Sequence, residues 1–248
     1  MELMTTPACI VYKNPDGSLK FVHQQNITYP PPNLSQIISQ PPAGDTVYTP
    51  DNSPQIGTFR FLHKTITYSL FIKQGQVIND IPHQHNIAIA VHAALTCWKL
   101  YSTLEFVQIP YTSADDADLT ICFSDSDPVF IQDPNAMAYT YYPNTKPQGA
   151  FTSVYNTKYL WSEDGKFNFT NNLNQTLRHE LGHGIGMVHT TNPKDIMYPF
   201  YHNDIIPTAM DIYQVQFNYG ASNYPKWMID AFFKLDSKLE EFKVQPSA

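Results

Sequence analysis

The chain has 248 residues, of which 42% are hydrophobic and 15% are charged, and its formal net charge is -7. This composition predicts one packed domain with extensions, because disordered chains combine low hydrophobicity with high net charge. The sequence has no block of Lys and Arg that could neutralise phosphates and no run of about 18 apolar residues, so neither nucleic-acid binding nor a membrane span is expected.

The first residues and the cysteines bear on the compartment. The opening MELMTTPACIVYKNPDG has no basic region and too short an apolar run for a secretory signal, so export by that route is not expected and the compartment stays undefined. Cys9, Cys97 and Cys122 are too few, and odd in number, for a disulfide framework. We interpret them as buried free thiols, and we expect a monomer.

Residues 1 to 57 differ in composition from the rest of the chain. Nine of the 20 prolines fall before Gly57, in a region that is also rich in Asn, Gln and Ser. Proline fixes φ and removes a backbone donor, so we predict an irregular amino-terminal arm without a core of its own.

The region that follows contains strand and helix patterns. Residues 65 to 72 (TITYSLFI), 104 to 109 (LEFVQI) and 118 to 123 (DLTICF) are rich in β-branched and aromatic residues and predict strands. Between the first two, an amphipathic helix is predicted with Asn86 as its N-cap. Residues 124 to 165 show no clear period, and we predict a long loop that shapes a cleft.

Further helices are predicted toward the carboxy terminus. One begins at Asn172, with a glutamine three residues later that completes a pattern like a capping box. Another begins at Thr208, where Asp211 completes the box, and ends at Gly220. Residues 221 to 248 carry apolar side chains every three or four positions, which predicts an amphipathic helical tail.

One segment, which begins at His179, reads HELGHGIGMVH. Two histidines four residues apart share one face of a helix, so His179 and His183 can direct their imidazoles at one metal ion, with Glu180 adjacent. A catalytic zinc site has three protein ligands and leaves its fourth position to water, so a third ligand is required. His189 supplies it if the helix ends first, and Gly186 can end the helix because glycine adopts positive φ.

The predicted site suits hydrolysis. Three neutral histidines leave zinc its full 2+ charge, which lowers the pKa of bound water to about 7. Glu180 can then accept the proton of the attacking water and return it to the leaving amine, while zinc stabilises the oxyanion. The sequence therefore predicts a zinc-dependent metalloendopeptidase that cleaves a polypeptide substrate.

The motif HExxHxxGxxH resembles the metzincin signature, and DIMYP, at residues 195 to 199, resembles the methionine turn of that family. Met197 is the methionine that matches. The longer segment MYPFYH is similar to the MYPxYH of the matrixins, the matrix metalloproteinase subfamily. This resemblance implies that Pro199 and Tyr201 line the pocket that accepts a hydrophobic side chain on the primed side of the substrate.

The resemblance covers about residues 58 to 220. It implies an α/β fold with a twisted, mostly parallel five-stranded sheet and three helices, in which the active-site helix ends at the zinc. Family membership would also imply work outside the cell. We therefore divide the chain into an irregular arm (1 to 57), a matrixin-like catalytic domain (58 to 220) and a helical tail (221 to 248).

The sequence also departs from the family pattern. Typical matrixins carry a structural zinc and calcium ions, but residues 118 to 178 contain no histidine, and Tyr139 stands where the family usually has one. A second zinc is therefore not expected. Asp125, Asp127 and Asp133 could bind calcium through their oxygens, and the alternative is that they are ordinary solvated loop carboxylates.

Cys9 stands in PACIV, whereas the propeptide cysteine that silences matrixins stands in PRCGxPD. A cysteine switch is therefore not expected, and self-inhibition by the arm without a cysteine stays open. Two alternative functions also stay open: a zinc-containing module that binds a peptide or protein without cutting it, and a zinc hydrolase of small molecules. The presence of Glu180 together with all three histidines argues against the binding module.

Overall fold

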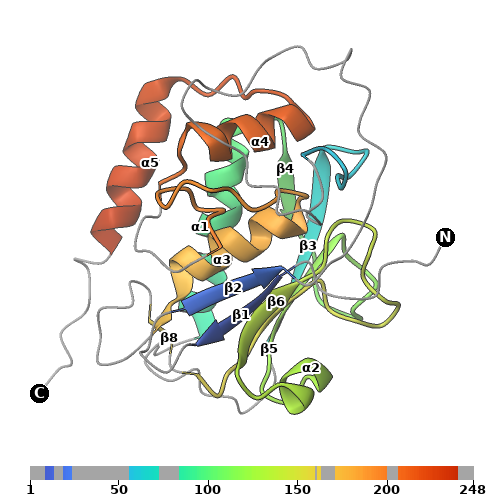
Figure 1. Ribbon diagram of the computed structural model, residues 1–248. Coiled ribbons are helices and arrows are strands. Elements are labelled where there is room, and N and C mark those ends of the chain that lie inside the picture. The colour runs from blue at the N-terminus through green and yellow to red at the C-terminus, as the bar shows by residue number, and fades with distance from the viewer. Residues whose placement is uncertain are drawn as a thin grey trace, which may run out of the picture.

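The computed structural model describes residues 9–13, 19–23, 56–72, 84–159, 161–162, 171–199 and 206–239. These residues form a twisted sheet and a layer of helices. Figure 1 shows α1 (Gln84–Tyr101) and α3 (Leu173–Gly184) together on one side of that sheet. The core lies between the two layers.

The centre of the sheet is mostly parallel, as the family resemblance implies. Four strands run parallel to one another, namely β3 (Thr65–Ile72), β4 (Glu105–Gln108), β5 (Leu119–Phe123) and β7 (Ser153–Tyr155). The fifth strand, β6 (Ala136–Thr140), is antiparallel to its neighbour β7. These five strands confirm the predicted sheet. The strands β3, β4 and β5 also lie where the sequence patterns predict strands.

The prediction of a continuous loop over residues 124 to 165 is wrong. This segment contains α2 (Pro128–Gln132), β6, β7 and β8 (Trp161–Ser162), and β8 pairs in parallel with β9 (Asn171–Asn172). Every residue of β6 and β7 is buried. Neither strand therefore shows the alternation of apolar and polar residues that identifies a strand with one face in water.

The prediction of an irregular arm needs correction as well. Within residues 1 to 57, β1 (Cys9–Lys13) and β2 (Leu19–His23) form an antiparallel hairpin, and β1 also pairs antiparallel with β6. The full sheet has seven strands in the order β2-β1-β6-β7-β5-β3-β4 (Figure 1). The runs CIVYK and LKFVH favour strands, and the sequence NPDGS between them favours a turn, so the hairpin agrees with the local sequence although the segment as a whole is rich in proline.

Two long helices carry most of the helical part of the core. α1 (Gln84–Tyr101) begins at Gln84, so Asn86 lies in its first turn and is not the N-cap that the sequence suggested. α3 (Leu173–Gly184) is capped by Asn172, whose side chain accepts a hydrogen bond from the backbone N–H of Gln175 at 2.9 Å. This cap is the one that the sequence predicts.

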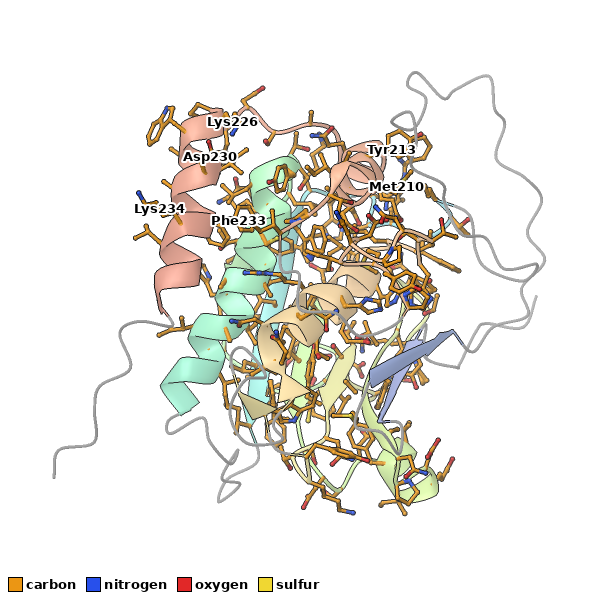
Figure 2. All side chains as sticks on the ribbon, turned by 60° about the vertical axis from the view of Figure 1, so that its left-hand side comes forward. Met210, Tyr213, Lys226, Asp230, Phe233 and Lys234 are labelled. Carbon is orange, nitrogen blue, oxygen red and sulfur yellow. The ribbon has the colours of Figure 1, made fainter. Side chains whose placement is uncertain are left out.

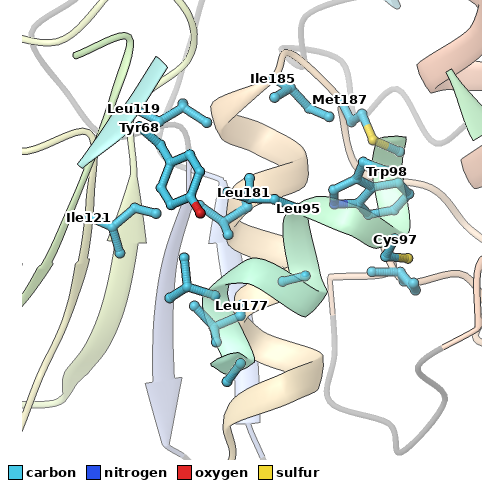
Figure 3. Packing of buried hydrophobic residues seen from close by; sticks show 14 of the residues in the cluster. Tyr68, Leu95, Cys97, Trp98, Leu119, Ile121, Leu177, Leu181, Ile185 and Met187 are labelled. Carbon is cyan, nitrogen blue, oxygen red and sulfur yellow. The ribbon is translucent and has the colours of Figure 1, made fainter. Parts of the chain in front are cut away.

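The hydrophobic core fills the space between these helices and the sheet, and burial of each large apolar side chain contributes about 1.5–3 kcal/mol. Figure 3 shows its central members, all of them buried: Tyr68, Leu95, Trp98, Leu119, Ile121, Leu177 and Leu181. Trp98 of α1 also donates a hydrogen bond from its ring nitrogen to the carbonyl of Arg178 at 3.1 Å. Packing and this bond together fix the position of α3.

α4 (Ala209–Tyr219) begins with the predicted capping box. In this box the side chain of Thr208 faces the backbone N–H of Asp211. The carboxylate of Asp211 in turn accepts a hydrogen bond from the backbone N–H of Thr208 at 3.0 Å. The helix ends at Gly220, which has a φ of 85°. The sequence therefore located both ends of this helix.

α5 (Lys226–Leu239) lies within the tail that the sequence predicts to be helical. Phe233 points toward the domain, where its ring lies 5.9 Å from the guanidinium carbon of the buried Arg178, whereas Lys234 points away from it (Figure 2). Among the residues that the structure describes, no helix has the length and hydrophobicity needed to cross a bilayer.

Candidate metal centre

The imidazoles of His179, His183 and His189 meet at one point. Their Nε2 atoms are 3.1 Å apart for His179 and His183, and each of the two lies 3.2 Å from that of His189. A tetrahedral zinc ion with bonds of about 2.0–2.1 Å needs nitrogens about 3.3 Å apart, so this triangle fits one zinc. Within the described ranges, it is the one group of three or more His, Cys, Asp or Glu side chains that could hold a metal ion.

Backbone carbonyls fix the orientation of two of the rings. Nδ1 of His179 lies 2.7 Å from the carbonyl oxygen of Ile196, and Nδ1 of His183 lies 2.8 Å from that of Met187. A carbonyl oxygen can only accept, so each Nδ1 donates its proton and each Nε2 of the neutral ring presents a lone pair. The lone pairs therefore face each other, and a shared cation stabilises this arrangement.

The chain reverses direction at Gly186, which has a φ of 87°. The N–H of Gly186 donates to the carbonyl of His183 at 2.8 Å, and the N–H of Met187 donates to that of Gly182 at 2.9 Å. These two bonds make a Schellman motif, the common way to end a helix at a glycine. Gly186 thus lies at the reversal that the sequence analysis assigns to it, and the reversal brings His189 back to the helix.

α4 holds the segment between this turn and His189. Gln214 accepts a hydrogen bond from the N–H of Val188 at 2.8 Å and donates one to the carbonyl of the same residue at 3.0 Å. Asn218 donates to the carbonyl of Gly186 at 3.2 Å, and the hydroxyl of Tyr219 donates to that of Ile185 at 2.9 Å. No local sequence pattern predicts these contacts, because they join segments about 30 residues apart.

Met197 lies directly against α3. A Cβ added to Gly182 would lie 2.5 Å from the sulfur of Met197 and 3.4 Å from the ring of Trp98, so a side chain at this position would require Met197 to move. Met197 is fully buried, and its carbonyl accepts a hydrogen bond from the N–H of Thr190 at 3.0 Å. The methionine turn therefore supports the helix between its two histidines.

Asp211 anchors the same turn from α4. Its carboxylate accepts hydrogen bonds from the N–H groups of Ile196 at 2.8 Å, Met197 at 3.1 Å and Thr208 at 3.0 Å. Burial raises the pKa of this carboxyl to about 7, although the backbone donors oppose the rise. Because the carbonyl of Ile196 also orients the ring of His179, Asp211 helps to position that imidazole through the backbone of Ile196. The sequence identified Asp211 only as a helix cap.

Glu180 lies next to the first histidine of the motif and is fully buried. Neither of its carboxylate oxygens makes a hydrogen bond of full geometry with a described residue, although the side chain of Thr140 is near enough to act on the carboxyl group. Burial raises the pKa of Glu180 to about 8, and the side chain of Thr140 offsets only part of this rise. A buried carboxyl group without a full hydrogen bond destabilises a fold, which is typical of a residue that serves chemistry.

Of the two residues assigned to the substrate pocket, the structure describes Pro199. Pro199 is half-buried and lies two positions beyond Met197. Tyr201 lies outside the described residues. Their roles in the pocket remain predictions.

The loop carboxylates considered for calcium make local contacts. Asp127 caps α2 by accepting a hydrogen bond from the N–H of Val129 at 3.0 Å, and Asp133 accepts one from Asn135 at 3.1 Å. Within the described part of the chain, Asp125, Asp127 and Asp133 do not gather into a group of metal-ligating side chains. These contacts favour the alternative of ordinary loop carboxylates.

Cys97, Cys122 and Tyr139 are buried in the interior of the protein. Cys97 and Cys122 are buried and form no disulfide, as predicted. Burial raises the pKa of Cys122 to about 12, so its thiol stays protonated at neutral pH. Cys9 is the first residue of β1, and its side chain lies outside the described part. Tyr139 packs in a second apolar cluster, with its ring 5.7 Å from that of Phe130.

Fold and site together define a class of protein. A mostly parallel sheet, a helix that ends at a glycine turn, and three converging histidines beside a glutamate are the arrangement of the metzincin zinc metalloproteases. The family model described as Matrixin matches residues 60–220. The chain belongs to the matrixin family, which uses a catalytic zinc, and its three histidines could hold that ion.

Individual relatives are distant in sequence. Matrix metalloproteinase-16 of Homo sapiens is 28% identical over 151 residues, which cover 57% of this chain and 24% of the relative. Macrophage metalloelastase of Rattus norvegicus is 33% identical over 136 residues, which cover 52% of this chain and 28% of the relative. Matrix metalloproteinase-2 of Drosophila melanogaster is 29% identical over 156 residues, which cover 59% of this chain and 20% of the relative. The chain thus matches about a quarter of the length of these relatives.

Proposed function

We propose that this protein is a zinc-dependent metalloendopeptidase that hydrolyses peptide bonds within polypeptides. The observation that carries the proposal is the triangle of Nε2 atoms from His179, His183 and His189, with edges of 3.1–3.2 Å. Zinc at these nitrogens supplies Lewis-acid chemistry, which polarises the scissile carbonyl and makes water more acidic.

Glu180 is the general base in this proposal. It neighbours the first ligand, His179, and a carboxylate there can take the proton of the attacking water and deliver it to the leaving amine. Burial raises the pKa of Glu180 in the metal-free protein, and a cation held by the three histidines would favour the ionised carboxylate, which is the form that accepts a proton. The Nδ1 protons of the ligands are engaged by the carbonyls of Ile196 and Met187, so the rings do not compete as acids.

The substrate pocket is proposed from the segment MYPFYH. Pro199 follows the methionine turn closely and is half-buried, which suits the wall of a pocket at the edge of the site. Tyr201 is assigned to the same wall. We expect a hydrophobic substrate side chain on the primed side, and we expect a monomer. The family usually works outside the cell, and the compartment of this chain stays undefined.

A library of internally quenched peptides tests the proposal. The protein is assayed with zinc, after removal of zinc by a chelator, and after zinc is restored, and mass spectrometry of the products locates the cleaved bonds. We expect cleavage of internal bonds that the chelator abolishes and zinc restores. Cleavage that continues without metal would overturn the proposed mechanism.

The same experiment separates the alternatives. A protein that binds one equivalent of zinc and retains peptides without cutting them is a binding module. A protein that cuts no peptide but hydrolyses small esters or amides in a zinc-dependent manner is a different hydrolase. In either case the metal centre stands and the assignment as an endopeptidase is wrong.

A further inference from the structure

The strand β6 lies beside the metal centre. α3 packs against both β6 and β7, so the helix that carries the histidines covers this part of the sheet. A Cβ on Gly184 would lie 3.6 Å from the methyl carbon of Thr140, the last residue of β6. Two residues further, the ring of Tyr142 lies 5.6 Å from that of His183. An extended segment paired to β6 on the side away from β7 is therefore close to the site.

The side of β6 away from β7 is occupied by β1. Within the described sheet, β1 is the neighbour of β6 there, with Cys9 opposite Thr140, Ile10 opposite Tyr139 and Val11 opposite Ala138. Without β1, the backbone N–H and C=O groups on this side of β6 would form a free edge, and such edges bind extended peptides by adding them as a strand.

We propose that the β1–β2 hairpin occupies the edge on which a polypeptide substrate pairs with the catalytic domain, and thereby blocks its own active site. This inference rests on the proposed peptidase function. An extended substrate needs the same backbone groups of β6 that β1 uses, so hairpin and substrate exclude each other. Because the hairpin belongs to the same chain, its binding to β6 is intramolecular, and a substrate in solution must compete with its effective concentration.

The hairpin also has the features of a removable element. The hairpin precedes residues 60–220, which are the part of the chain that the family model matches, so it is an addition to the strands and helices of the family domain. Each of its strands has five residues, and the pairing with β6 shifts register between Val11 and Tyr12. A two-stranded hairpin is marginally stable by itself, so its contact with β6 decides whether it stays in place.

The first experiment weakens the hairpin in the full chain. The double substitution Ile10→Pro and Val11→Pro removes two successive N–H groups, and these point to opposite neighbours in an antiparallel ladder, so at least one bond to β6 is lost. The matched control is Ile10→Thr and Val11→Thr, which keeps both N–H groups and strand propensity. We expect the proline variant to cleave quenched peptides with a kcat/KM at least tenfold above the control.

The second experiment measures binding without cleavage. The probe is a fluorescent peptide of residues 7 to 14, PACIVYKN, with its cysteine replaced by serine so that no thiol can reach the metal. Both variants are made in a Glu180→Ala background, and the affinity is measured by fluorescence anisotropy. We expect at least tenfold tighter binding to the proline variant, because its β6 edge is free.

The outcomes separate the two proposals. If both variants cleave peptides at the same measurable rate, or bind the probe peptide with the same affinity while cleavage is measurable, self-blocking is overturned and the peptidase assignment stays intact. Selective probe binding without cleavage by any variant supports the blocked edge and refutes the peptidase function. If the proline variant does not fold, a specific protease site inserted between residues 24 and 55 and cut after folding releases the hairpin instead, and the same comparisons apply before and after cutting.

Discussion

Gly186 approaches Phe59 so closely that no other residue fits at the turn. A Cβ on Gly186 would lie 1.7 Å from the carbonyl oxygen of Phe59. Phe59 is itself buried, and its ring stacks on that of Tyr142 with centroids 4.5 Å apart. The segment before β3 therefore closes over the turn that returns the third histidine to the metal centre.

Gly186→Ala is expected to lower stability by more than 3 kcal/mol, because it adds a backbone clash to the cost of about 1–2 kcal/mol for a left-handed residue with a side chain. Gly149→Ala is the matched control, since Gly149 has a φ of 76° with nothing within 4 Å of its added Cβ. Urea unfolding of both variants measures the difference. Equal losses would show that the contact with Phe59 relaxes at little cost.

Glu180→Ala is expected to keep one equivalent of zinc and to lose about 10²–10⁴-fold in kcat, the usual contribution of general acid–base catalysis. The ligands lie on other residues, so metal binding does not need the carboxylate. Zinc content by atomic absorption and cleavage of a quenched peptide measure the two properties. Glu105→Ala, at an exposed glutamate paired with Lys99, is the control that should match the parent. An active Glu180→Ala variant would remove this residue from the mechanism.

Gln214→Leu is expected to weaken zinc binding by about 10- to 100-fold, the range typical of residues that hold metal ligands in place. The substitution leaves the buried N–H and C=O of Val188 unpaired, next to His189. Competition with a fluorescent zinc chelator measures the affinity. Gln216→Leu on the same helix removes a contact with Tyr101 instead, so it should change stability and leave zinc affinity unaltered.

Asp211 should make stability depend on pH. Burial raises its pKa from 3.8 to about 7 in the folded protein, so between these values the folded state keeps a proton that the unfolded chain releases. The folded state then binds more protons, and stability falls as pH rises through this window, by up to about 1.4 kcal/mol per unit. Above pH 7 the effect is complete.

The comparison with Asp211→Asn isolates this group, because asparagine does not titrate. The unfolding free energy of the parent minus that of the variant should decrease from pH 4 to pH 7 and then level off. Urea unfolding at pH values from 4 to 8 measures it, with Asp230→Asn on the exposed face of α5 as the reference substitution. A difference that stays constant would mean that the N–H donors of Ile196 and Met197 keep the carboxylate ionised throughout.

The sequence predicted those elements of the fold whose signals are local. The caps at Asn172 and Thr208 and the strand β3 depend on residues a few positions apart. β6 was missed because its residues are buried on both faces, where apolar runs lose their period. The hairpin is hard to predict because its strand patterns, CIVYK and LKFVH, are short and lie within residues 1 to 57, whose overall composition favours irregular structure.

The candidate site divides in the same way. The three histidines and Gly186 lie within 11 consecutive residues, so their spacing alone predicts a helix that ends in a turn and brings the histidines together. The supporting residues Asp211 and Gln214 lie about 15 and 26 residues from the groups they bind. Such pairings depend on how α4 packs, which no local pattern specifies.

The dependence of the metal site on α4 sets an order in which the protein becomes competent during synthesis. The motif HELGHGIGMVH is synthesised before residues 209 to 219. Until α4 is complete, the carbonyls and N–H groups of the turn and of Val188 lack the side chains that hold them. Newly made chains therefore contain the three histidines before α4 can hold the turn between them, and a nascent chain halted before Tyr219 has the motif without the side chains that position it.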